Sequence, residues 1–145
     1  MIKEKKSVNY LTFQEIEIIY RFFFDRSKKM EEPVPDWSFV DKSKIINIVA
    51  IPQKKYFDLE CYPTLEEKAA IIFYEINKGH IFPNGNKRMS VFCLLVFLSI
   101  NDYSFEVSPD EMRNKALELA KSEASHFEEV INNLILWIQE KHANT

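Results

Sequence analysis

Glycine is nearly absent from this chain, since only two of its 145 residues are glycine. Turn-rich β architecture usually needs more of them, because glycine adopts the backbone conformations of tight turns without steric cost. The scarcity therefore favours helices over sheets. Both glycines, Gly79 and Gly85, lie beside one short segment, and they make it the place where the backbone is freest.

Cysteines and long apolar runs are also scarce. Cys61 and Cys93 form neither a metal-binding spacing nor a disulfide framework, which favours a reducing cytoplasm. The longest apolar run, residues 89–100, is shorter than the roughly 20 residues that a membrane span needs. No apolar signal-peptide core follows the basic residues Lys3, Lys5 and Lys6. We expect a cytoplasmic protein with no membrane attachment.

An excess of positive charge is lacking as well. The chain has 19 Lys and Arg against 22 Asp and Glu, a formal net charge of −3. Proteins that bind nucleic acid usually present a basic surface, so we expect no nucleic-acid partner. Hydrophobic residues make up 46% of the chain and aromatic residues 14%, enough for a real core. We expect one domain over residues 1–145.

Helix-start signals recur along the chain. A Ser or Thr followed three residues later by Glu has the spacing of a capping box, which satisfies backbone N–H groups of the first turn. Four such pairs precede apolar periodicity: Thr12 and Glu15, Thr64 and Glu67, Ser108 and Glu111, and Ser125 and Glu128. Residues 45–57 begin like a helix and then indicate an extended segment or a short hairpin after Pro52.

The run at residues 89–100 is apolar on nearly every side of a helix. Such a helix is one that other helices surround. The sequence therefore predicts an all-α fold, a compact bundle of about six helices around this central one, with one short β-hairpin as the only sheet.

Residues 80–88, which precede the central helix, have the composition of a reactive site. Gly85 permits a positive φ, and N–H groups at a helix start are unpaired and point at an anion. Lys87 adds a point charge and Arg88 a planar fork of donors. His80 can hold or release a proton near neutral pH. Together these features suit a ligand with a phosphate chain.

Each feature also has an ordinary interpretation. A lone histidine such as His80 more often interacts with carbonyls at a helix end. Lys87 and Arg88 alone would fit a solvated helix edge, and Asn84 with Gly85 is a common turn dipeptide. Their occurrence together in one short segment favours the functional interpretation.

The segment resembles the signature of the Fic/Doc family, His-x-Phe-x-acid-Gly/Ala-Asn-Gly/Lys-Arg. The matching residues are His80, Phe82, Gly85, Asn86, Lys87 and Arg88. Lysine at position 87 is similar to the Doc (death-on-curing) branch, whereas Gly85 is closer to the general Fic pattern. The resemblance extends roughly from Ile45 to Ser122 and implies the helical Fic/Doc fold.

The resemblance implies a transferase that uses ATP and Mg²⁺ to modify a Ser, Thr or Tyr hydroxyl of a protein substrate. In the Doc branch the transferred group is the terminal phosphate and the target is elongation factor Tu; in typical Fic proteins the group is AMP. We expect phosphoryl transfer by a toxin. The family's self-inhibitory Ser/Thr-x-x-x-Glu-Gly/Asn string does not occur, so a separate antitoxin chain is expected.

The resemblance also implies individual roles. His80 would be the general base. Phe82 would anchor the loop, and Asn86 would orient phosphates or cap the central helix. A flap formed by the segment before the active loop would hold the target by strand addition. Five residues would bind the phosphates: Asn84, Gly85, Asn86, Lys87 and Arg88.

Asn84 departs from the family, which usually has Asp or Glu there as a magnesium ligand. A neutral amide oxygen binds a hard cation less tightly than a carboxylate does. Three alternatives remain. The nucleotide phosphates hold the ion with Asn84 as a weak ligand, or Lys87 and Arg88 carry more of the charge, or catalysis is lost and the fold is a nucleotide- or phosphate-binding interaction module. We prefer the first two.

Overall fold

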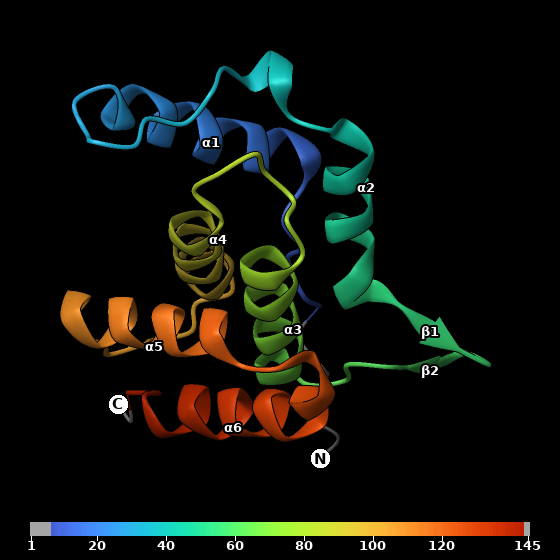
Figure 1. Ribbon diagram of the computed structural model, residues 1–145. Helices are drawn as coiled ribbons and strands as arrows, with labels where there is room; N and C mark the ends of the chain where they lie inside the picture. Colours follow the sequence, from blue (N-terminus) through green and yellow to red (C-terminus); the bar gives the residue numbers. More distant parts are fainter. Residues whose placement is uncertain (1–6, 144–145) are drawn as a thin grey trace.

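The computed structural model describes residues 7–143 (Figure 1). Lys3, Lys5 and Lys6 lie outside the described residues, as do the two ends of the predicted domain. Within them are six α-helices and one small hairpin, which confirms the all-α prediction. The helices are α1 Phe13–Ser27, α2 Lys42–Ala50, α3 Leu65–Lys78, α4 Asn86–Ile100, α5 Pro109–Lys121 and α6 Phe127–Glu140. The antiparallel strands are β1 Lys55–Tyr56 and β2 Leu59–Glu60, and short 3₁₀ turns occupy Trp37–Phe39, Ile51–Gln53 and Ala124–His126.

Helix α4 is the central helix of the bundle, as predicted. It packs most extensively against α3 and also against α1 and α5 (Figure 1). Met89, Leu94 and Phe97 are completely buried along it. A helix with neighbours on three sides needs apolar residues on all of them, which explains its composition. None of the helices in residues 7–143 has the length and apolar character that crossing a bilayer requires.

Three of the four predicted helix starts are confirmed. The Thr12 and Glu15 side chains cap each other's backbone, with Glu15 N donating to Thr12 Oγ1 at 3.1 Å. Thr64 and Ser108 likewise accept hydrogen bonds from the N–H three residues on. These interactions satisfy donors that a helix start otherwise leaves unpaired.

The prediction of a capping box at Ser125 is wrong. Ser125 lies inside the 3₁₀ turn Ala124–His126, and α6 begins after it at Phe127 with no side-chain cap. His126 N donates to Glu123 O at 3.0 Å. That turn already takes the chain into helical curvature, so the capping position falls on His126 rather than on Ser125.

The ambiguous segment resolves into α2, a 3₁₀ turn and the hairpin, whose two turn residues, Phe57 and Asp58, have φ values of 48° and 65°. Lys68, which is 1% exposed, fixes the hairpin base to the first turn of α3. Its Nζ lies 3.1 Å from Glu60 Oε1 and also donates to the carbonyl of Tyr62. The hairpin therefore lies at the N-terminal end of α3, which is about 20 Å long.

The loop of residues 80–88 begins at the other end of α3 (Figure 1). The hairpin therefore does not occupy the place beside the active loop that the family resemblance implied for a flap. The reason is the Lys68 anchor, which holds the hairpin base at the start of α3.

Candidate active site at the start of helix α4

The loop between α3 and α4 carries its histidine on a constrained backbone. His80 has a φ of 51°, in the left-handed region that residues other than glycine rarely adopt. Its carbonyl oxygen accepts a hydrogen bond from Lys44 Nζ of α2 at 3.0 Å. The His80 side chain is exposed to solvent. A contact from a second helix thus fixes the backbone, while the imidazole stays accessible to a substrate.

Phe82 attaches the loop to α1. Its side chain is 3% exposed and stacks on the Tyr20 ring, with 5.1 Å between centroids and 20° between planes. Tyr20 Oη in turn donates to Pro35 O at 2.6 Å. Burial, helped by the Asp36 charge, raises the pKa of Tyr20 to about 12, so this hydroxyl remains a donor at physiological pH.

Asn86, the first residue of α4, closes the loop on itself. Its Nδ2 donates to Phe82 O at 2.9 Å, and its Oδ1 accepts from Phe82 N at 2.9 Å. Both ends of the amide are therefore bonded to one backbone unit. This arrangement directs the Asn86 side chain into the loop.

Gly85 occupies the N-cap of α4 for two separate reasons. Its φ of 77° is left-handed, which glycine tolerates best. A Cβ there would lie 2.9 Å from Val34 Cγ1 and 3.0 Å from Phe23 Cε1, so a side chain would displace α1 or the loop after it. No side chain caps α4 among the described residues, and its first N–H groups remain available to an anion.

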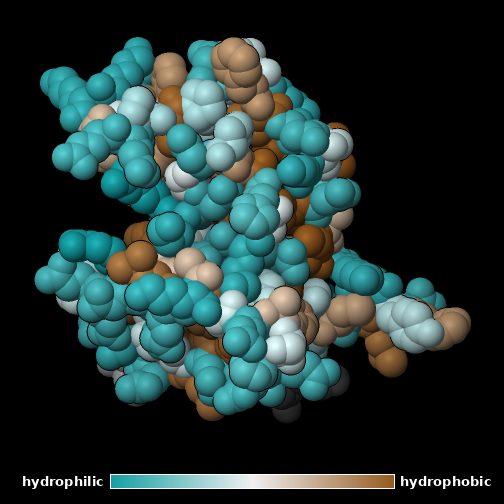
Figure 2. Space-filling view, viewed as in Figure 1, coloured by the Kyte–Doolittle hydropathy of each residue, from teal (hydrophilic) through white to brown (hydrophobic). Residues whose placement is uncertain are grey.

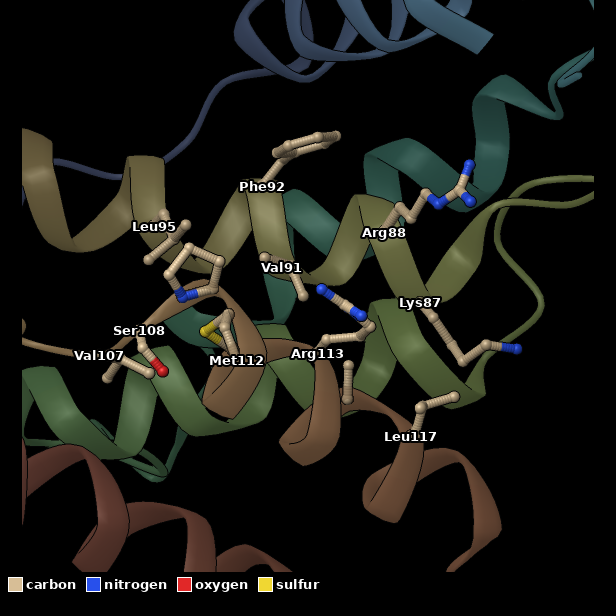
Figure 3. Close-up of a pocket in the computed structure, with 12 residues that line it drawn as sticks. Lys87, Arg88, Val91, Phe92, Leu95, Val107, Ser108, Met112, Arg113 and Leu117 are labelled. Carbon is tan, nitrogen blue, oxygen red and sulfur yellow. The ribbon is translucent and has the colours of Figure 1, made fainter. Parts of the chain in front are cut away.

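Two exposed cations follow on the first turn of α4. Arg88 is directed toward α1, where its Nη1 lies 2.7 Å from Met30 Sδ and its guanidinium carbon 5.9 Å from the Phe23 ring centroid. In Figure 3 the Lys87 side chain diverges from that of Arg88. The helix start therefore presents two separate positive charges, in addition to its own dipole.

Asn84 is exposed and donates from Nδ2 to Pro33 O at 3.3 Å. With the nitrogen so engaged, Oδ1 is the atom available to a cation. Residues 7–143 contain no group of three or more His, Cys, Asp or Glu side chains that would hold a metal. A single neutral oxygen fits an ion carried mainly by phosphate oxygens and does not fit a cage built by the protein alone.

A cavity of about 690 Å³ opens beside the cations, between α4 and α5. Figure 3 shows Lys87 and Arg88 at one end, Val107 and Ser108 at the other, and Arg113 of α5 between them. Figure 2 shows a hollow in the same side of the molecule, between the part formed by α1 and the part formed by α5.

The structure thus brings together every predicted site residue on one short loop and helix start. It adds residues that sequence reasoning missed: Lys44 of α2, Arg113 of α5, and Tyr20, Phe23 and Val34 from α1 and the loop after it. No local pattern marks these five, because each reaches the site only through helix packing. An isolated lysine or arginine on a polar helix face looks like an ordinary solvated residue.

The chain is similar to a known protein family over a range that includes the loop of residues 80–88. A sequence model of the Fic/DOC family matches residues 10–98, more than half of the chain. The match starts before Ile45, so it includes α1, and it ends within α4. No curated protein matches the sequence.

Proposed function

Because the chain belongs to the Fic/DOC family, whose members transfer nucleotide or phosphate groups to proteins, we propose that it transfers the terminal phosphoryl group of ATP. The acceptor is a Ser, Thr or Tyr hydroxyl of a target protein. One observation carries this proposal: the exposed imidazole of His80 and the uncapped start of α4 belong to the same loop, which the Asn86 side chain closes by hydrogen bonds to Phe82. A base and an anion site on one short loop suit the deprotonation of a hydroxyl beside a phosphate.

His80 takes the proton of the target hydroxyl as the hydroxyl oxygen bonds to the γ-phosphorus. The bond between that phosphorus and the β–γ bridging oxygen breaks, and ADP leaves with the electron pair. The carbonyl contact from Lys44 holds the His80 backbone during this step. Phe82, buried against Tyr20, keeps the loop from moving away.

The phosphate charge is met by three kinds of group. The N–H groups at residues 86–88 form a cradle, Arg88 offers a fork of donors, and Lys87 adds a mobile point charge. Mg²⁺, when bound, neutralises phosphate charge, and Asn84 Oδ1 is the protein oxygen that would face it. The side chain of Asn86 shapes the cradle through Phe82.

For the biological role, we propose a toxin of the Doc type in the cytoplasm. Its target would be a translation factor such as elongation factor Tu, and its partner a separate antitoxin chain. What supports this is Lys87 at the position that distinguishes the Doc branch.

Two other functions have a specific observation in their favour. Gly85, where Doc proper has alanine, favours Fic-type adenylyl transfer. Asn84, a neutral residue at the usual acidic position, favours a catalytically weakened module that binds a nucleotide or a phosphate group. The same experiment separates all three.

The experiment uses ATP labelled at the α- or the γ-phosphate, incubated with purified protein, Mg²⁺ and bacterial lysate. We expect label on a target protein from the γ-position only, lost in His80→Ala and retained in His126→Ala, a matched change at an exposed histidine outside the loop. Transfer of label from the α-position would show that the protein transfers an adenylyl group and not a phosphoryl group. If the protein binds ATP but transfers label from neither position, the result would favour the interaction module over both enzymes.

A further inference from the structure

Three methionines lie within residues 7–143, and one of them is open to solvent. Met30, in the loop after α1, is 40% exposed, whereas Met89 and Met112 are 0% and 4% exposed. The fourth methionine, Met1, lies outside the described residues. Oxidation of a thioether to a sulfoxide requires that the oxidant reach the sulfur. Among these three side chains, Met30 is therefore the one that a dissolved oxidant attacks.

The sulfur of Met30 lies against a cation of the candidate active site. Arg88 Nη1 donates to Met30 Sδ at 2.7 Å. A thioether sulfur is a weak acceptor. None of the ion pairs within residues 7–143 includes Arg88, so no carboxylate there competes for its donors. A weak contact of this kind lets the guanidinium turn toward a phosphate, whose oxygens offer stronger, charge-assisted bonds.

The loop that carries Met30 is fixed beside the start of α4. Met30 N donates to Ser27 O at 2.9 Å, and Val34 N donates to Ser27 Oγ at 3.1 Å. Ser27 is completely buried, so both ends of the loop are attached to the core. Farther along, Asn84 Nδ2 donates to Pro33 O at 3.3 Å. A chemical change at the Met30 sulfur therefore takes place next to Arg88.

We propose that Met30 is a redox-sensitive modification site that controls whether Arg88 is available to phosphate. The inference rests on the proposed function, which gives Arg88 its phosphate ligand. The oxidant is a peroxide. A lone pair of the sulfur attacks one oxygen of hydrogen peroxide, the O–O bond breaks, and proton transfer leaves the sulfoxide and water. The sulfur loses two electrons, which the peroxide gains, and methionine sulfoxide reductases reverse the change.

The sulfoxide converts a weak contact into a strong one. Its oxygen carries partial negative charge and accepts a charge-assisted hydrogen bond from the guanidinium of Arg88. The guanidinium is then held toward α1, where it already lies 5.9 Å from the Phe23 ring centroid. Its forked contact with a phosphate is lost. Lys87 and the N–H groups at the start of α4 remain, so phosphate binding weakens without disappearing.

The test is calorimetric titration with ATP before and after treatment with hydrogen peroxide. All proteins carry Cys61→Ser, which removes the exposed thiol as a second target. Peptide mass spectrometry should find the added oxygen on Met30 and not on Met89 or Met112. We expect the Kd for ATP to rise about fivefold on oxidation and to return to its starting value after treatment with methionine sulfoxide reductases.

Three variants separate this effect from general oxidative damage. Met30→Leu keeps an apolar side chain without the sulfur, so peroxide should leave its Kd for ATP unchanged. Arg88→Gln removes the cation, so its Kd, although higher from the start, should not rise further on oxidation. Met30→Gln places an amide oxygen near Arg88 and should raise the Kd about threefold without peroxide. Met1 is present in every variant, so its oxidation cancels in the comparison.

Three results would overturn the inference: resistance of Met30 to peroxide, an unchanged Kd once Met30 is fully oxidised, or the same rise in Kd in Met30→Leu or Arg88→Gln. Failure of the proposed function is a separate outcome. In that case the untreated protein transfers no label, while its Kd for ATP still depends on the oxidation of Met30. If the untreated protein binds no ATP, both the inference and the proposed function are wrong.

Discussion

The side-chain amide of Asn86 donates to the carbonyl of Phe82 and accepts from its N–H, each at 2.9 Å. The first residue of α4 is thereby joined to the most deeply anchored residue of the loop, since Phe82 is buried against Tyr20. The pair holds the segment between them in one shape, with the helix start facing outward. A preorganised loop of this kind stabilises phosphate charge without rearranging when the charge develops.

Asn86→Ala should therefore both destabilise the protein and slow transfer. The loss of two hydrogen bonds is expected to lower the free energy of unfolding by about 1–3 kcal/mol. Urea denaturation measures this change, and transfer of γ-label measures the activity. Asn84→Ala is the control: its one bond is exposed and 3.3 Å long, so the free energy should change by less than about 0.5 kcal/mol. Equal denaturation midpoints for wild type and Asn86→Ala would show that the hydrogen bonds between Asn86 and Phe82 do not stabilise the loop.

Gly85→Ala should destabilise the protein by about 1–3 kcal/mol, because alanine is strained at a φ of 77°. Contact of the new methyl group with Val34 and Phe23 would add to that strain. Thermal unfolding followed by circular dichroism gives the measurement. Ser99→Ala, an exposed site on the same helix, should leave the melting temperature close to that of wild type. If Gly85→Ala is as stable as wild type, neither the positive φ nor the contact with Val34 and Phe23 restricts this position to glycine.

Lys44→Met should reduce the rate of transfer several-fold with little change in stability. The lysine donates to His80 O from another helix, and its loss frees a backbone held at a φ of 51°. The effect should appear in kcat rather than in KM for ATP, because the contact positions the base and not the phosphates. Lys44→Arg keeps a donor and should restore part of the rate. Identical kcat values for Lys44→Met and wild type would exclude a positioning role.

Asn84→Asp should lower the Mg²⁺ concentration needed for half-maximal transfer, because a carboxylate binds a hard cation more tightly than an amide. The titration of γ-label transfer against Mg²⁺ measures this shift. Asn114→Asp adds the same charge at an exposed position on α5 and serves as the control. An unchanged Mg²⁺ dependence would indicate that position 84 does not face the metal.

Glu111 makes stability depend on pH on the acid side. Hydrogen bonds from Trp137 Nε1 and Lys141 hold the pKa of its carboxyl below the ordinary value. A carboxyl whose pKa is lower in the folded state stabilises the protein above the unfolded pKa of about 4.3 and loses this contribution as the pH falls. The melting temperature of wild type should therefore fall more steeply between about pH 5 and pH 3 than that of Glu111→Gln. Glu129→Gln, at an exposed site on α6, should follow the wild-type curve.

Local signals in the sequence determined the helices and the position of the loop. The caps at Thr12, Thr64 and Ser108 each join residues only three positions apart, so they depend on the local sequence and not on tertiary contacts. The same spacing at Ser125 predicted a cap that does not form, because Ser125 lies inside a 3₁₀ turn that precedes α6. The loop motif was equally visible, since residues 80–88 follow one another directly.

Only the tertiary structure decided what surrounds that loop. Lys44 lies 36 positions from His80 and still holds its carbonyl. Val34 and Phe23 reach Gly85 because α1 packs on α4, and Arg113 reaches the cavity because α5 lies beside α4. Contacts between distant segments depend on how the helices pack. That packing is determined by the volumes of all the buried side chains together. A short segment of sequence specifies a cap or a turn, but it does not specify which helix will pack against it.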